Sequence, residues 1–187
     1  MAAVDFITAL GRVLHSGALR DAFAADAVAC VRRIGLRESD WPAFLQLAPA
    51  DLEFQARTLL RKRFELVRRA LPATCTALGR EAWPVFERYG RLNAPAGRDP
   101  TNGDILGFAL HLDHESNESL DPGELNRCRF VCGSRRLAGH IVISPRRLGL
   151  PTLQILLRQG SGRWQEWRLY LSFRKSPLAA CVASAAN

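Results

Sequence analysis

The sequence has no uninterrupted run of about 18 or more apolar residues, which is the length that a membrane-spanning helix requires. Its first ten residues carry Asp5 and lack the basic stretch that opens a secretory signal peptide. The five cysteines are odd in number and do not show the spacing of a disulfide framework. These absences predict a cytoplasmic protein that stays out of the membrane and keeps its thiols reduced.

The sequence also lacks the motifs that carry common enzyme chemistry. It contains no glycine-rich phosphate-binding loop of known spacing. Ser134, Ser144 and Ser161 lie outside the strand-turn-helix glycine context that a nucleophile elbow needs. The chain has four histidines, and none has a convincing catalytic partner nearby in sequence. We therefore predict a non-catalytic chain with no cofactor of its own.

One cluster of metal-capable side chains is present, in the sequence His-Leu-Asp-His-Glu from His111 to Glu115. Two histidines three residues apart can share one face of a helix, and Asp113, Glu115 and Glu118 are candidates for further oxygen ligands. No second ligand cluster of a matching type occurs elsewhere, so a solvated polar helix end is the better interpretation. A small metal-dependent enzyme built on His111, Asp113 and His114 is the weaker alternative.

Acidic residues are scarce in the last third of the chain. From residue 121 to residue 187 there are three acidic side chains against 11 basic ones, whereas the first 120 residues hold 15 of each. The formal net charge of +8 is therefore a property of one segment. Charge that is segregated in this way indicates a surface made for a partner.

The hydrophobic pattern changes at the same place. Up to residue 120 apolar residues recur at helical spacing, which predicts helices over residues 4–15, 49–70, 81–92 and 101–115. Asp121-Pro122-Gly123 is typical of a turn, and after it the period becomes two. This alternation predicts strands over residues 127–132, 140–144, 153–158 and 167–174, with residues 160–162 forming the turn between the last two.

The sequence thus predicts an α+β protein. An N-terminal helical bundle occupies residues 1–120, and a small, basic antiparallel β-sheet domain with a short C-terminal tail occupies residues 121–187. On the last strand we expect Trp167 and Phe173 in the core, with Trp164 and Tyr170 exposed among arginines.

Three segments carry a family resemblance. Residues 61–72 (RKRFELVRRALP) form a basic helix that runs into Leu-Pro, residues 77–83 (ALGREAW) follow as a small-residue turn with Leu-Gly, and residues 107–110 (GFAL) lie in a later helix. With the arginine-rich strands behind them, these segments resemble a bacterial family of partner subunits that accompany multinuclear iron oxidases of the TIM-barrel type. Within that family the chain is most similar to the MbnC-type subunits of methanobactin biosynthesis, over about two-thirds of its length.

The resemblance implies an accessory subunit that forms a heterodimer with an iron-containing oxidase subunit of the MbnB type, which holds all of the iron. The complex binds a ribosomal precursor peptide of the MbnA type through its leader. It then uses dioxygen to convert cysteines of the peptide into oxazolone and thioamide groups on the way to a copper chelator. This chain would supply leader recognition and no catalysis.

A precursor peptide is expected to pair with one edge of the sheet, either near residues 127–132 or at residues 164–173. The peptide-binding residues on these two edges are Arg127, Arg129, Val131, Arg168, Tyr170 and Ser172. Arginines at the strand ends are expected to contact the oxidase subunit and to steer its association. They are Arg135, Arg136, Arg146, Arg147 and Arg174.

A nucleic-acid-binding transcriptional regulator is the alternative function. It is favoured by the excess of arginine near the tryptophans of the last strand and by the basic face of the helix between Arg57 and Arg69. On that helix Asp51, Glu53 and Glu65 dilute the positive charge, so a solvated face is the simpler interpretation there. We therefore expect polypeptide partners rather than DNA or RNA.

Overall fold

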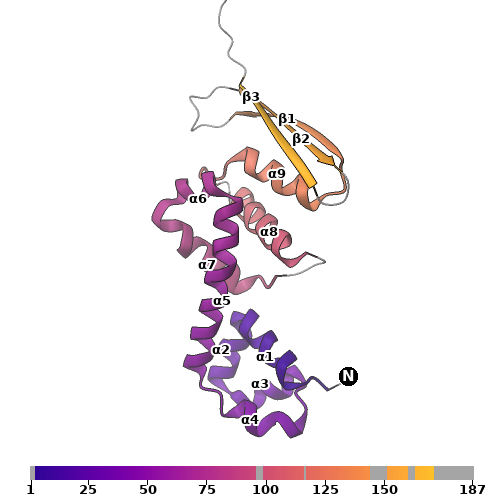
Figure 1. Cartoon of the computed structure of the whole chain (residues 1–187). Helices are drawn as coiled ribbons and strands as arrows, with labels where there is room; N and C mark the ends of the chain where they lie inside the picture. Colours follow the sequence, from indigo (N-terminus) through magenta and orange to yellow (C-terminus); the bar gives the residue numbers. More distant parts are fainter. Residues whose placement is uncertain (1–2, 96–98, 116, 144–150, 160–162, 171–187) are drawn as a thin grey trace, which may run out of the picture. The chain divides into compact units, whose positions relative to one another are not determined.

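The computed structural model describes residues 3–95, 99–115, 117–143, 151–159 and 163–170, and it divides into two compact units, Met1–Cys132 and Gly133–Asn187. The first unit is built from helices and the second contains a three-stranded antiparallel sheet (Figure 1). The predicted α+β class, with helices first and a small antiparallel sheet at the C-terminal end, is therefore confirmed. Among the residues described, no helix combines the length and the apolar character that crossing a membrane requires.

The first group of helices in the helical unit encloses a small aromatic core. Its members are α1 (Phe6–His15), α2 (Gly17–Ala25), α3 (Ala27–Ile34) and α4 (Trp41–Leu45), with a 3-10 turn at Glu38–Asp40. The ring of Phe44 is fully buried and meets the rings of Phe6 and Phe23 edge to face at 5.2 and 5.7 Å. Gly35 ends α3 in the left-handed conformation (φ 75°), which is common at helix C-termini and which glycine adopts readily.

Helix α5 (Pro49–Ala70) runs through both helical groups, and Figure 1 shows α1–α4 near one of its ends and α6–α8 near the other. Its bounds coincide with the predicted helix 49–70. Leu52 packs in the first core, whereas Leu60 and Val67 pack in the second. The spacing of these apolar positions keeps one stripe of α5 facing inward along its whole length.

The second group surrounds a larger core. Its members are α6 (Pro72–Leu78), α7 (Ala82–Leu92), α8 (Pro100–His114) and α9 (Pro122–Cys132), with a 3-10 turn at Gly79–Glu81. Phe86 and Phe108 are fully buried, and their rings meet edge to face at 5.2 Å. Charged side chains join this group to the first one, because Glu53 of α5 accepts hydrogen bonds from both Arg20 (2.8 Å) and Arg91 (2.7 Å).

Residues 127–132 were predicted as a strand, and this prediction is wrong because they form the end of helix α9. The cause lies in Asp121-Pro122-Gly123. Instead of making a turn, Asp121 caps the helix by accepting the N–H of Glu124 at 3.0 Å, and Pro122 takes the first helical position. Leu125 and Cys128 then both pack in the second core. They are three residues apart, which is a helical spacing, so this burial favours the helix over a strand.

Because α9 is a helix, the helical unit ends at Cys132, whereas the sequence predicted its end at residue 120. The charge boundary follows it. Residues 1–132 contain 17 basic and 17 acidic side chains, and residues 133–187 contain nine basic ones against Glu166 alone. The whole net charge of +8 therefore belongs to the second unit, which we call the β unit.

The sheet of the β unit has the strand order β1-β2-β3, with β1 at Leu137–Ile143, β2 at Pro151–Gln159 and β3 at Arg163–Tyr170. Both pairings are antiparallel. The register places Ile141 opposite Leu153 and Leu153 opposite Leu169, which forms one row across the three strands. Three of the predicted strands are thus present, while the predicted turn at 160–162 and the predicted strand residues 171–174 lie outside the described residues.

Candidate functional site

The two faces of the sheet differ in an unusual way. The face that carries Val142, Thr152, Gln154 and Leu156 is buried at all four positions. It is also the more polar face. The buried amide of Gln154 donates to the carboxylate of Glu166 at 2.9 Å. Because polar side chains occupy the buried face, the apolar residues of the strands lie on the other side.

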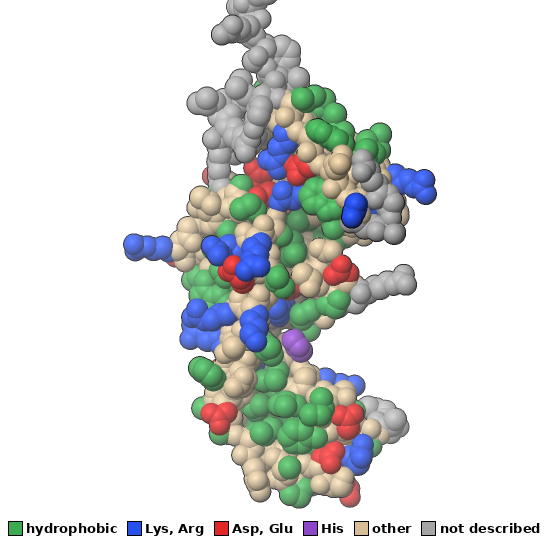
Figure 2. Space-filling model, viewed as in Figure 1, with side chains coloured by type: hydrophobic (Ala, Val, Ile, Leu, Met, Phe, Trp, Pro, Cys, Tyr) green, Lys and Arg blue, Asp and Glu red, His purple; other side chains and the backbone are tan. Residues whose placement is uncertain are grey.

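That other face, which we call the open face, is apolar across all three strands. Three rows cross it: Ile141 with Leu153 and Leu169, Gly139 with Ile155 and Trp167, and Leu137 with Leu157 and Gln165. Ile143 follows at the end of β1. Hydrophobic side chains gather over the strands in Figure 2. Five large side chains of this face have exposed fractions between 43 and 68%: Leu137, Ile141, Ile143, Trp167 and Leu169.

Sequence reasoning missed the open face. Trp167 was expected in the core, and its exposed fraction of 43% shows that this prediction is wrong. The signal was available, because every second residue from Leu137 to Ile143, except Gly139, and from Leu153 to Leu157 is apolar. A period of two identifies which residues share a face, but it does not say whether that face is covered.

Of the predicted peptide-binding residues on the last strand, Arg168 and Tyr170 lie on β3, which is an outer strand of the described sheet. In the strand register they stand opposite Gln154 and Thr152 of β2. The guanidinium of Arg168 forms an ion pair with Glu166, so its charge is largely balanced within the strand. Ser172 lies outside the described residues.

Arg127, Arg129 and Val131 do not lie at a sheet edge, because they belong to helix α9 of the helical unit. Arg127 donates to the carbonyl oxygen of Ala70. Arg129 forms an ion pair with Asp113 at 3.0 Å, which joins α9 to α8. The prediction that these residues form a strand edge is therefore wrong, and the two arginines instead bond to neighbouring helices.

Among the arginines expected at a partner interface, Arg135 and Arg136 are exposed and precede β1. The carbonyl oxygen of Arg136 accepts the N–H of Arg158 at 2.8 Å, which fixes the start of β1 beside the end of β2. These two arginines therefore lie at one end of the sheet. Arg146, Arg147 and Arg174 fall outside the described residues.

Carboxylates neutralise part of the basic face of α5. Arg57 forms an ion pair with Glu87 at 3.0 Å, and both Arg68 and Arg69 bond to Glu65. This arrangement favours the solvated-face interpretation, because neutralised arginines contribute little to binding phosphates.

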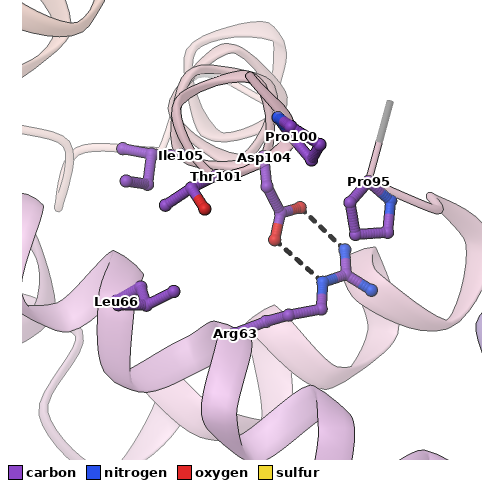
Figure 3. A pocket seen from close by; sticks show the side chains of 7 residues that line it. All are labelled: Arg63, Leu66, Pro95, Pro100, Thr101, Asp104 and Ile105. Carbon is purple, nitrogen blue, oxygen red and sulfur yellow. Dashed lines mark hydrogen bonds and ion pairs between the residues drawn. The ribbon is translucent and has the colours of Figure 1, made fainter. Parts of the chain in front are cut away.

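Arg63, from the same helix, lines a small pocket of about 130 Å³ between α5 and α8 (Figure 3). Its guanidinium forms a two-pronged ion pair with Asp104, with distances of 2.8 and 2.7 Å. It also donates to the carbonyl oxygens of Gly90 (3.2 Å) and Asn93 (2.8 Å). The protein accepts four of the five N–H donors of Arg63, so this side chain joins α5, α7 and α8 and has little capacity left for a ligand.

The side chains of the predicted His111–Glu115 cluster point to different partners. His111 lies 3.5 Å from Glu115, whereas Asp113 pairs with Arg129 of α9. His114 is exposed at the end of α8. Within the described part of the chain, no three His, Cys, Asp or Glu side chains are close enough together to hold a metal ion.

Two buried thiols lie in the second core. Burial, together with the nearby charge of Glu124, raises the pKa of Cys75 to about 11, and burial likewise raises the pKa of Cys128 to about 11. Both thiols are therefore protonated at neutral pH and behave as small apolar side chains. Cys132, at the end of α9, is exposed.

A scan against protein-family models, a search of curated proteins and a search of solved structures each returned no match for this chain.

Proposed function

We propose that this protein is a non-catalytic partner subunit that binds other polypeptides through its β unit. The observation that carries the proposal is the construction of that unit, a three-stranded sheet with outer strands and an exposed apolar face in a segment with nine basic residues and one acidic residue. Exposed apolar patches with a polar rim mark interaction surfaces on proteins. The resemblance to MbnC-type subunits suggests what the polypeptides are.

On this proposal the partners are an iron-containing oxidase subunit of the MbnB type and a ribosomal precursor peptide of the MbnA type. The oxidase subunit carries out the oxidation of peptide cysteines to oxazolone and thioamide groups. The present chain holds the leader of the peptide beside it. It contributes no iron ligand and no catalytic group.

The precursor peptide adds to the sheet as a fourth strand along an outer strand. Backbone pairing supplies affinity in this mode, and alternate side chains of the added strand supply specificity. Of the two edges that the sequence suggested, only the one on β3 is a strand, and β1 is the other outer strand of the described sheet. A peptide on either edge places every second side chain beside the open face, so alternating apolar residues are expected in the leader.

Co-expression with an iron-oxidase subunit and size-exclusion chromatography test the pairing, and a single co-eluting complex is expected. Hydrogen–deuterium exchange then tests the peptide site. Addition of the leader peptide should protect backbone amides of either β1 or β3, whereas a scrambled peptide of equal composition should not. Two proteins that elute separately, or amide protection confined to the helical unit, would refute the proposal.

A nucleic-acid-binding function is the second candidate, and one local arrangement favours it. Trp164 has an exposed fraction of 38% and stands opposite Arg158 in the register, next to Arg163. Aromatic rings beside arginines stack on the bases of single strands. Fluorescence anisotropy with labelled single-stranded DNA and RNA decides the matter: binding must weaken steeply with salt, and no signal at low salt would end this candidate.

A further inference from the structure

We propose that the open face of the sheet is a docking surface for an acidic, amphipathic helix of a partner protein. The inference rests on the proposed function, since it names the surface and the chemistry by which the β unit recognises a protein other than the extended peptide. The open face is distinct from the strand edges at which that peptide pairs.

The apolar character of the open face argues that something covers it. Its central row, formed by Ile141, Leu153 and Leu169, is apolar on all three strands, and the outer members are 68 and 54% exposed. The largest apolar patch on a typical monomer covers about 300–600 Å² and is often functional. The open face, with five large side chains that are each more than two fifths exposed, is a patch of this size class. A helix is a common cover for the apolar face of a sheet.

The charge of the β unit selects the partner. With nine basic residues against one acidic residue, the unit is strongly cationic, and Arg135 and Arg136 lie beside the start of β1. A helix whose apolar stripe is bordered by glutamate and aspartate would match both the apolar open face and the net positive charge of the unit. A second copy of this chain would bring two units of charge +8 together, so the charge disfavours self-pairing.

A lipid surface fits less well than a protein. The sheet has β1 as an outer strand, and the hydrocarbon of a bilayer offers no partner to the outward backbone groups of such a strand. A protein helix covers the face while the strand edge stays in water or pairs with a peptide.

The missing side chain at Gly139 leaves a gap in the open face. Gly139 lies in the row of Ile155 and Trp167, and no atom lies within 4 Å of the position that a Cβ atom would take. Its φ is not among the positive values of the described glycines, so a larger residue fits the backbone there. The row therefore has a notch on β1, into which a side chain of the docking helix can insert.

The probe is a hydrocarbon-stapled helical peptide with leucine along one stripe and glutamate on both flanks. Stapling prevents it from pairing as a strand, so it reports on the face alone. A matched peptide carries lysine in place of each glutamate. Full-length protein should bind the acidic helix at least about tenfold more tightly than the lysine helix, and raising the salt from about 0.05 to 0.5 M should reduce the difference.

Variants of the full chain locate the site. Ile141→Ser combined with Leu169→Ser should weaken binding of the acidic helix by about tenfold or more. Gly139→Leu should also weaken it, by about threefold or more, although this change adds apolar surface, because it fills the notch. Phe54→Ser, which removes a side chain of the helical unit that is 69% exposed, should leave the affinity unchanged.

The fluorescence of Trp167 tells whether the face is free before the peptide is added. The difference in emission between the wild type and Trp167→Phe should be that of a solvated indole, and it should shift to shorter wavelength on binding. A buried emission in the free protein would overturn the proposal, because the chain itself or a second copy would then cover the face. Sedimentation that shows a dimer dispersed by the Ile141→Ser and Leu169→Ser pair would identify the second copy.

Two further outcomes would also overturn the proposal. Equal affinity for the acidic and lysine helices would remove the role of charge, and binding to phosphatidylserine vesicles without binding to the helix would assign the face to a membrane. The leader-peptide experiment is independent of these results. If the leader peptide still protects β1 or β3 amides in the double variant while helix binding is lost, the strand edge and the open face are two independent binding sites.

Discussion

Glu124 of α9 caps helix α6 through Thr74, whose backbone N–H and hydroxyl it accepts at 3.0 and 2.7 Å. The same carboxylate accepts the N–H of Ala73 at 2.8 Å. Glu124 is 2% exposed, and Arg127 lies 3.9 Å away from it. A buried negative charge at the N-terminus of a helix is stabilised by the free N–H groups there, so this contact joins two helices that lie 50 residues apart in sequence.

Replacing Glu124 by alanine should lower the free energy of unfolding by about 3–5 kcal/mol, because it leaves the buried N–H groups at the start of α6 and the hydroxyl of Thr74 without their acceptor. Urea denaturation monitored by circular dichroism measures the change. Glu118→Ala removes an exposed carboxylate near the same helix and should change the free energy by less than about 0.5 kcal/mol. A loss below about 1 kcal/mol for Glu124→Ala would show that the cap contributes little.

Arg63 and Asp104 provide a second test of the helical unit. Arg63→Met should cost about 3–5 kcal/mol of unfolding free energy, since Asp104 is 6% exposed and would be left buried without its partner. Lysine at position 63 should rescue only part of this loss, because its ammonium group does not reproduce the fork that meets a carboxylate and two carbonyls.

Lys62→Met is the matched control for Arg63→Met, because the neighbouring Lys62 is exposed. Its unfolding curve should coincide with that of the wild type within about 0.5 kcal/mol. If Arg63→Met and Lys62→Met unfold at the same denaturant concentration, the ion pair is not the clamp that its geometry indicates.

Arg129 distinguishes a helix from a strand at residues 122–132. Proline at this position should cost about 3 kcal/mol or more and lower the helical signal in circular dichroism, since it lies inside α9. Alanine there should cost less than about 1 kcal/mol, because the ion pair with Asp113 is about half exposed. An outer strand would tolerate the proline, so equal stability of the two variants would contradict the helix.

The same segment shows why the sequence alone predicted most of the fold but not this element. Long helices such as α5 carry many apolar positions, and their period is unambiguous. Asp-Pro-Gly is suited both to a turn and to a helix start, and Cys128, Phe130 and Cys132 mimic a strand over a few residues. The hydrogen bond between Thr74 and Glu124 is present in the structure that has the helix. It forms only in the folded core, so neither the sequence around Thr74 nor that around Glu124 could predict it.

The candidate site was predicted in part for a similar reason. Charge segregation and the alternation on β3 located the β unit, and both are local properties of the sequence. The exposure of Ile141 and Leu169 depends on which face of the sheet is buried, and Gln154, whose amide donates to Glu166, lies on the buried face. A buried face that is polar reverses the usual expectation that the apolar residues are the buried ones.

The buried thiols predict how stability depends on alkaline pH. The folded chain keeps Cys75 and Cys128 protonated up to about pH 11, whereas a thiol in the unfolded chain has a pKa near 8.5. A raised pKa in the folded state gives a contribution that is complete below about pH 8.5 and is lost as the pH rises to about 11. Each thiol should remove about 2–3 kcal/mol of unfolding free energy over this interval.

Urea denaturation at a series of pH values measures this loss, and Cys75→Ala with Cys128→Ala provides the comparison. The double variant is less stable at pH 7 because it leaves small cavities, but its stability should fall much less between pH 8.5 and about 10.5. Burial raises the pKa of Tyr89 to about 12. Above about pH 10 its titration should therefore lower the free energy of unfolding by a similar amount in both proteins. Parallel curves for the two proteins below pH 10 would mean that the thiols of the second core titrate in the folded chain as they do in water.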